Sequence, residues 1–184
     1  MDDDLKNDVG DLYSQIAGEE STALGDLLAK IPGLSGYMER GRRREADSIL
    51  RDTIVGRLEQ VRLQLSDVHH ALSRDIVLAM DYAEELGRAE TRLMSLMGKI
   101  KDAPVGYAGY FDAIKVKEED LARIYAFDNE MLVHVDQIMA DVDTLQSAVN
   151  RGAQIEAAIA QLNKDVALAN DTFTGRTEVM RGIG

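Results

Sequence analysis

The sequence predicts an all-α protein: an elongated antiparallel helical bundle with coiled-coil-like packing, four main helices and a short N-terminal helix. Three observations lead to this fold class. Only two of the 184 residues are proline, and proline is the residue that a helix interior tolerates least, so long uninterrupted helices are possible. Apolar residues recur at alternating gaps of three and four, which is the spacing of helices packed along one seam. Val and Ile do not alternate with polar residues between turns, so we expect no strands.

The chain divides into three parts. The acidic segment 1–30 is expected to form the short amphipathic helix, which would dock on its own bundle or, as the alternative, on another chain. Pro and Gly punctuate residues 31–36 twice, which predicts a turn. The bundle itself is expected over 31–174, and residues 175–184 are expected to be a frayed tail. The short helix takes its apolar stripe from Leu5, Val9, Leu12 and Ile16.

The first two long helices are predicted over 37–72 and 74–101. We place a break near residue 73 because Ser73 can cap a helix N-terminus and Asp75 suits a first turn. A single continuous helix of about 65 residues is the alternative, since the heptad pattern alone does not demand a break. The seam of the first helix is Ile54, Leu58, Val61, Leu65, Val68 and Leu72. The inward residues of the second are expected to be Ile76, Met80, Ala83, Leu93, Met97 and Ile100.

The third and fourth long helices are predicted over 117–149 and 155–173. Acidic residues at 118–120 favour a helix start there, because a first turn attracts negative charge. The Asn-Arg-Gly sequence at 150–152 predicts the C-cap of the third helix. The seam of the third helix is Leu121, Ile124, Asp128, Met131, Val135, Ile138, Val142, Leu145 and Val149. That of the fourth is Ile155, Ile159, Leu162, Val166, Ala169 and Phe173.

Asp128 is the one charged member of these seams. A lone carboxylate in an apolar seam is unfavourable unless a cation accompanies it. Helices that run antiparallel in turn bring the start of the first long helix close to the start of the third. The rise of about 1.5 Å per residue then puts an arginine of the run at 42–44 level with Asp128. We therefore predict a buried ion pair between Asp128 and Arg43 or Arg44.

The aromatic loop of the chain, at 103–116, is expected at the same end of the bundle. It carries Tyr107, Tyr110 and Phe111 among glycines, and Tyr37 starts the first long helix nearby. One interpretation is a packed plug that closes the bundle. The other is a partner-binding surface, because Tyr and Arg are over-represented at binding hot spots. A small-ligand or anion site is a third possibility that the residues leave open.

Composition excludes several function classes. The net charge of −12 disfavours nucleic acid and anionic membrane surfaces as partners. The chain has no cysteine, so it has no disulfide and no thiolate metal site, which suits a reducing cytoplasm. No apolar run approaches about 18 residues, so no segment is expected to span a membrane. Neither a P-loop nor Gly-x-Ser-x-Gly occurs, and we assign no catalytic residue and no cofactor.

The sequence thus favours a non-enzymatic, cytoplasmic interaction or scaffold protein that binds protein partners, further copies of itself included. The main alternative is a ferritin-like, carboxylate-bridged metal protein, an oxidoreductase or a metal store. Its ligands would be Asp67, His70, Glu130 and His134, which offer one Asp-x-x-His and one Glu-x-x-x-His pair. A peripheral membrane adaptor is the third alternative, and the charge argues against it.

Three segments resemble a family of small uncharacterised bacterial α-helical proteins. They are IPGLSGYMERGRRREAD at 31–47, GYAGYFDAIKVKEEDL at 106–121 and YAFDNEML at 125–132. The resemblance covers residues 31–149, with a weaker echo in the last helix. It implies no particular chemistry, but it directs attention to these three segments.

Overall fold

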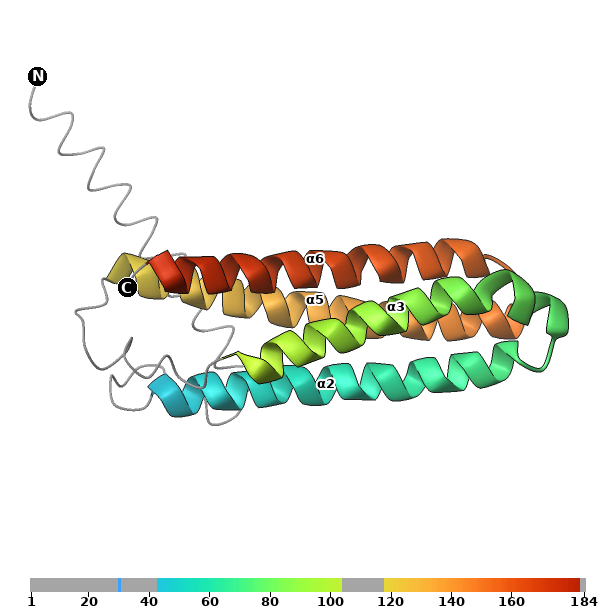
Figure 1. The fold of residues 1–184 in the computed structure, drawn as a ribbon, viewed down its shortest axis with the longest axis horizontal. Coiled ribbons are helices and arrows are strands. Elements are labelled where there is room, and N and C mark those ends of the chain that lie inside the picture. Colours follow the sequence, from blue (N-terminus) through green and yellow to red (C-terminus); the bar gives the residue numbers. More distant parts are fainter. Residues whose placement is uncertain (1–29, 31–42, 104–117, 183–184) are drawn as a thin grey trace, which may run out of the picture.

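A computed structural model describes residue 30, residues 43–103 and residues 118–182. At the helix ends the described side chains are fewer: they cover 48–103 and 123–178. Over these residues the protein is a bundle of four long helices without a strand (Figure 1). They are α2 (Arg43–Leu72), α3 (Ile76–Asp102), α5 (Glu118–Arg151) and α6 (Ile155–Gly182). The predicted all-α class is confirmed. The predicted short N-terminal helix lies outside the described residues. Of the segment 1–30 only Lys30 is described, and it donates a hydrogen bond to Asn129 of α5.

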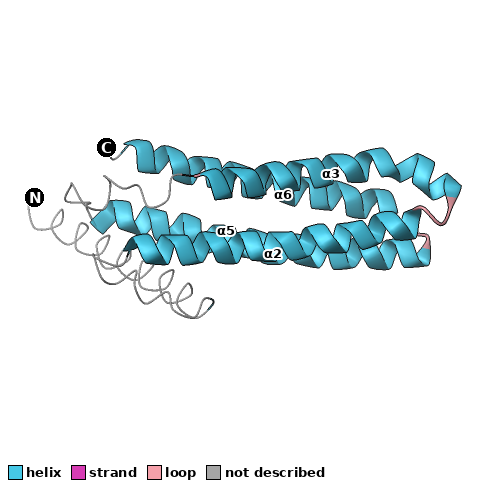
Figure 2. Ribbon diagram, turned by 60° about the horizontal axis from the view of Figure 1, so that its bottom comes forward, coloured by secondary structure: helices cyan, strands magenta, loops and turns pink. Residues whose placement is uncertain are grey.

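Successive helices run in opposite directions, and each packs against two neighbours: α2 and α6 each contact both α3 and α5. Hydrogen bonds across the bundle show which neighbours are parallel. Arg57–Asp136 and Gln64–Asp143 both join residues 79 apart, so α2 and α5 run in the same direction. Bonds from α3 to α6 likewise join residues 71 apart. The chain therefore forms two antiparallel hairpins side by side, with both short turns at one end (Figure 2).

The core lies where the heptad pattern predicts it on three of the four helices. The apolar seam residues expected between 54 and 72, 124 and 149, and 155 and 173 are all buried. On α3 the prediction is half wrong, because Ile76, Met80 and Ala83 are exposed. The offset of 71 between α3 and α6 explains this, since it places Ile155, where α6 begins, level with Glu84. The earlier turns of α3 have no α6 to pack on. The buried seam of α3 is Leu86, Ala89, Leu93, Leu96, Met97 and Ile100.

The turn between α2 and α3 confirms the predicted break near residue 73, but the capping residue is not Ser73. Asp75 is the N-cap: its Oδ1 accepts hydrogen bonds from the backbone N–H groups of Val77 at 2.9 Å and Leu78 at 3.3 Å. The Ser73 hydroxyl instead donates to the carbonyl of His70, within the last turn of α2. Ser73 therefore closes one helix, and Asp75 opens the next.

The turn between α5 and α6 has the C-cap that the Asn-Arg-Gly sequence predicts. Gly152 has a φ of 65°, a backbone conformation that glycine adopts without strain. Its N–H bonds the carbonyl of Val149, and the N–H of Ala153 bonds that of Ala148. This pair of bonds is the Schellman motif, which satisfies carbonyls that the end of a helix leaves without a partner.

The last helix is longer than predicted. Residues 175–184 were expected to fray, whereas α6 continues as far as Gly182. Two contacts hold this extension against α5. Arg176 is buried between the helices, and Gly175 packs so closely that a Cβ there would lie 3.4 Å from the Phe127 ring. Within the described ranges, no helix combines the length and apolarity that crossing a bilayer would need.

Candidate functional site

A buried ion pair joins α5 to α6 near the end of the bundle where α5 begins and α6 ends. Arg176 donates from Nε to Oδ1 of Asp128 at 2.5 Å, and the two residues are only 4% and 1% exposed. Asp128 is therefore buried beside an arginine, as expected. The arginine that pairs with it among the described side chains is Arg176. The side chains of Arg43 and Arg44 lie outside the described residues, so their predicted pairing with Asp128 stays a prediction.

Sequence reasoning missed Arg176 because its segment was assigned to a frayed tail. The signal was nevertheless present. The seam of α6 runs through Val166, Ala169 and Phe173, and the next gap of three reaches Arg176. An arginine in line with an apolar seam, on the helix antiparallel to the one carrying Asp128, marks a partner for that carboxylate.

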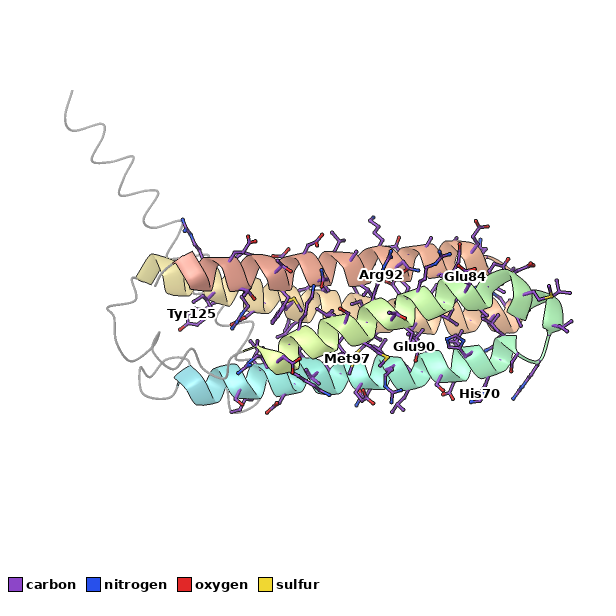
Figure 3. All side chains as sticks on the ribbon, viewed as in Figure 1. His70, Glu84, Glu90, Arg92, Met97 and Tyr125 are labelled. Atoms are coloured by element: carbon purple, nitrogen blue, oxygen red, sulfur yellow. The ribbon has the colours of Figure 1, made fainter. Side chains whose placement is uncertain are left out.

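Further polar side chains lie near this ion pair. Arg51 of α2 is buried and donates to the carbonyl of Ala103, the C-cap residue of α3, at 2.7 Å. The offset of 79 between α2 and α5 places Arg51 level with Glu130. Tyr125 is buried on α5 three residues before Asp128, at the end of the bundle seen in Figure 3. Buried polar groups thus gather at the end where α2 and α5 begin.

The four aromatic residues predicted to contact a partner are not among the residues that the structure describes. Tyr37, Tyr107, Tyr110 and Phe111 all lie outside the described residues. The helices that flank the loop do have the expected arrangement, because α3 ends where α2 and α5 begin (Figure 1). Whether the four aromatic residues form a plug or a partner-binding surface therefore stays a prediction.

The alternative metal ligands do not come together. Asp67 and His70 are exposed near the C-terminal end of α2, and the offset of 79 places His70 level with Val149. Val149 lies fifteen residues beyond His134, or roughly 22 Å along the helix axis. His134 instead lies 3.1 Å from the Thr172 hydroxyl and 3.6 Å from a carboxylate oxygen of Glu130. The ligand set built on these four residues is therefore wrong: each pair shares a helix face, but the two pairs lie far apart.

A second buried polar cluster lies in the middle of the α5–α6 interface, and sequence reasoning missed it. Asp141 and Asp165, each 6% exposed, come from facing positions of the two helices. Gln137 donates to Oδ1 of Asp141 at 3.0 Å, and Gln161 donates to Oδ2 of Asp165 at 2.7 Å. Oδ2 of Asp141 is buried without a hydrogen-bond donor. The signal was the repeated Gln-x-x-x-Asp, which is hard to notice in a chain with 33 acidic residues.

This environment raises the pKa of Asp141 to about 6. The main cause is burial, which removes water from the charged form, and the neighbouring Asp165 carboxyl adds to the shift. The hydrogen bond from Gln137 acts in the opposite direction, because it stabilises the charged form. Two buried carboxyl groups side by side cannot both be ionised without a large electrostatic penalty.

An exposed apolar cluster, the apolar tip, lies at the opposite end of the bundle from the Asp128–Arg176 pair. It consists of Ile76, Val77 and Met80, which are 76%, 61% and 82% exposed. These residues occupy the first turns of α3, beyond the start of α6. Ile76 and Met80 are four residues apart and therefore neighbours on one helix face.

Comparison with protein-family models, with curated proteins and with solved structures found no match to this chain. The resemblance carried by the segments at 31–47, 106–121 and 125–132 therefore stays an expectation.

Proposed function

We propose that this chain is a non-enzymatic helical interaction protein whose contacts with other proteins are made through the ends of its bundle. The observation that carries the proposal is the apolar tip. Its three large side chains face water although the same helix buries every seam residue from Leu86 onward. Isolated exposed apolar residues are ordinary, whereas a cluster with a charged surround is typical of a contact surface.

The surround of the apolar tip fits that description. The exposed residues next to it in the chain are polar or charged, and they include Arg74, Asp75, Asp81 and Glu84. A partner that covers the tip would remove its apolar side chains from water, at about 25 cal/mol per Å² of area buried. The charged neighbours would then remain at the rim, where they can select the partner by charge.

The aromatic and Arg-rich end, with Tyr37, Tyr107, Tyr110 and Phe111, is the second contact in this proposal. A protein with one contact surface at each end of a rigid bundle can join two partners, or further copies of itself, at a fixed separation. The proposed compartment is the cytoplasm, and the support for it is the absence of cysteine and the acidic charge. Within the described residues, no contact specifically favours the ferritin-like metal protein or the membrane adaptor.

The experiment compares three proteins: the parent, an Ile76→Ser/Met80→Ser variant and a Leu63→Ser/Leu168→Ser control. Leu63 and Leu168 are also exposed, at 54% and 42%, but each lies on a separate helix away from the tip. Sedimentation over a dilution series measures self-association, and affinity capture from a lysate identifies other partners. Helical content, measured by circular dichroism, must match in all three.

We expect the parent and the control to share an associated state or a captured protein that the tip variant loses. Equal behaviour of all three proteins would overturn the assignment of the tip. A Tyr110→Ser/Phe111→Ser variant, treated in the same way, tests the aromatic end separately. If neither end changes association or capture, the proposed function itself fails.

A further inference from the structure

The pair formed by Asp141 and Asp165 has no role in the proposed function. Two buried carboxyl groups that face each other are nevertheless costly and need an explanation. Both carboxyl groups are withdrawn from water at facing positions of α5 and α6. Each receives one hydrogen bond, from the glutamine four residues earlier on its own helix. Each bond lies within one helix. The contact between α5 and α6 at this point is therefore made by the two carboxyl groups themselves.

We infer that Asp141 and Asp165 share one proton, and that the resulting carboxyl–carboxylate hydrogen bond is a pH-sensitive latch between α5 and α6. In this arrangement the protonated carboxyl donates across the interface to its ionised neighbour. The buried Oδ2 of Asp141, which accepts no hydrogen bond from a donor, is then one end of that bond. Loss of the proton leaves two negative charges facing each other out of contact with water, and the interface loosens.

No described cation is placed to neutralise the pair. On the same flank of α5, His134 lies seven residues before Asp141, or roughly 10 Å along the helix, and contacts Thr172 and Glu130. Lys164 of α6 is exposed and forms no ion pair among the described side chains. The cations of α2 and α3 that are nearest in level have other partners: Arg57 with Asp136, Arg62 with Glu59, Arg92 with Asn163, and Lys99 with Asn170.

The direction of the pH effect follows from the pKa of Asp141. It is raised in the folded chain to about 6, against 3.8 for an ordinary aspartate. A raised folded-state pKa means that the folded chain holds a proton which the unfolded chain has lost. The latch therefore contributes its full stability below a pH of about 4, and this contribution is lost as the pH rises through about 6. Acidification tightens the α5–α6 hairpin, and neutral pH loosens it.

The first test needs only the parent protein. The ¹³C signals of the side-chain carboxyl groups are followed by NMR over a pH titration. We expect the Asp141 carboxyl to take up its proton with a midpoint above the ordinary aspartate value, and the Asp165 signal to respond to that same step. An Asp141 midpoint at the ordinary value, or an Asp165 signal that does not respond to that step, would overturn the shared proton.

The second test uses variants in which an amide replaces one carboxyl. Asp141→Asn keeps the size of the side chain and supplies a permanent N–H donor, so the bond to Asp165 no longer needs a proton. Asp165→Asn is the reciprocal variant. Asp143→Asn is the matched control, because Asp143 is exposed two residues further along α5. His134→Gln removes the imidazole that lies in the same α5–α6 interface, next to Thr172.

We expect the melting temperatures of the parent, of Asp143→Asn and of His134→Gln to decline as the pH rises from about 4 to about 6. Both Asn variants of the pair should lack this decline. At pH 7.5, amide hydrogen exchange in the middle of α5 and α6 should be slower in Asp141→Asn than in the parent, with α2 and α3 unchanged. The same pH dependence in Asp141→Asn and Asp143→Asn would overturn the latch, as would equal exchange at pH 7.5. A decline that disappears in His134→Gln would reassign the switch to the histidine.

Discussion

Arg176, in the last turns of α6, donates a hydrogen bond to Asp128 of α5 in the interior of the bundle. The aspartate lies in the apolar seam of α5, and every other described residue of that seam is apolar and buried. A buried carboxylate needs a cation, and the arginine that supplies it comes from the end of the chain. The ion pair therefore joins the C-terminal turns of α6 to α5 inside the bundle.

Removing Asp128 should destabilise the protein strongly. Asp128→Ala leaves Arg176 buried without this carboxylate, and breaking a buried pair in this way typically costs about 3–5 kcal/mol. Urea unfolding, followed by circular dichroism, measures the loss in the free energy of unfolding. Asp136→Ala is the control, because Asp136 is exposed and pairs with Arg57 at 2.8 Å on the surface. Such surface pairs contribute at most about 1 kcal/mol.

A double-mutant cycle checks the mechanism. If the effect arises from the unpaired arginine, Asp128→Ala combined with Arg176→Ala should cost clearly less than the sum of the two single variants. Additive losses would show that the two side chains contribute independently. Equal stability of Asp128→Ala and the parent would contradict the importance of the pair altogether.

The N-cap of α3 should show which of two neighbouring polar residues starts the helix. Asp75→Ala removes the acceptor of two backbone N–H groups, and the loss of such a cap costs typically about 1 kcal/mol. Ser73→Ala removes only a bond to a carbonyl in the last turn of α2, so we expect a smaller loss. Thermal unfolding of the two variants decides between them. A larger effect of Ser73→Ala would mean that the cap lies where the sequence alone suggests.

Two glycines should respond to alanine in opposite directions. Gly152→Ala forces an L side chain into a φ of 65°, which costs roughly 1–2 kcal/mol. Gly56→Ala lies in the exposed interior of α2 with open space around the new Cβ, and should stabilise by about 0.5–1 kcal/mol. Melting temperatures should therefore move down for the first variant and up for the second. A rise for Gly152→Ala would contradict the Schellman cap at the end of α5, and a fall for Gly56→Ala would contradict the open space around that residue.

The sequence predicts the middle of this bundle better than its ends. The seams of α2, α5 and α6 can be predicted because a heptad pattern reflects packing against neighbours along the whole helix. The pattern on α3 continues through Ile76 and Met80 although α6 does not extend to their level. How far each helix extends beyond its neighbours depends on the relative offsets of all four, and local spacing does not contain that information.

The candidate sites show the same division. Asp128 is recognisable from the sequence, because a charge in an apolar seam stands out against its neighbours. Its partner Arg176 depends on where α6 ends, which composition alone does not determine. Asp141 and Asp165 lie on the flank of their seams, where acidic residues are usually solvated, and only the antiparallel register of α5 and α6 brings them to face each other. Pairing across helices is a tertiary property, so it was missed.

The apolar tip should be dispensable for folding. Ile76 and Met80 are more than three-quarters exposed, so serine at both positions removes little buried apolar area. Surface substitutions of this kind usually change stability by less than about 0.5 kcal/mol each. Leu86→Ala, in the first buried turn of the same helix, should cost about 2–5 kcal/mol because it leaves a cavity in the core. Urea unfolding of the two proteins measures the contrast.

If the serine variant were as unstable as Leu86→Ala, the tip would have to be packed against another part of the chain, and its availability to a partner would be refuted. If it keeps the stability of the parent, the Ile76 and Met80 side chains are not needed for the fold, which is the condition that a contact surface must meet.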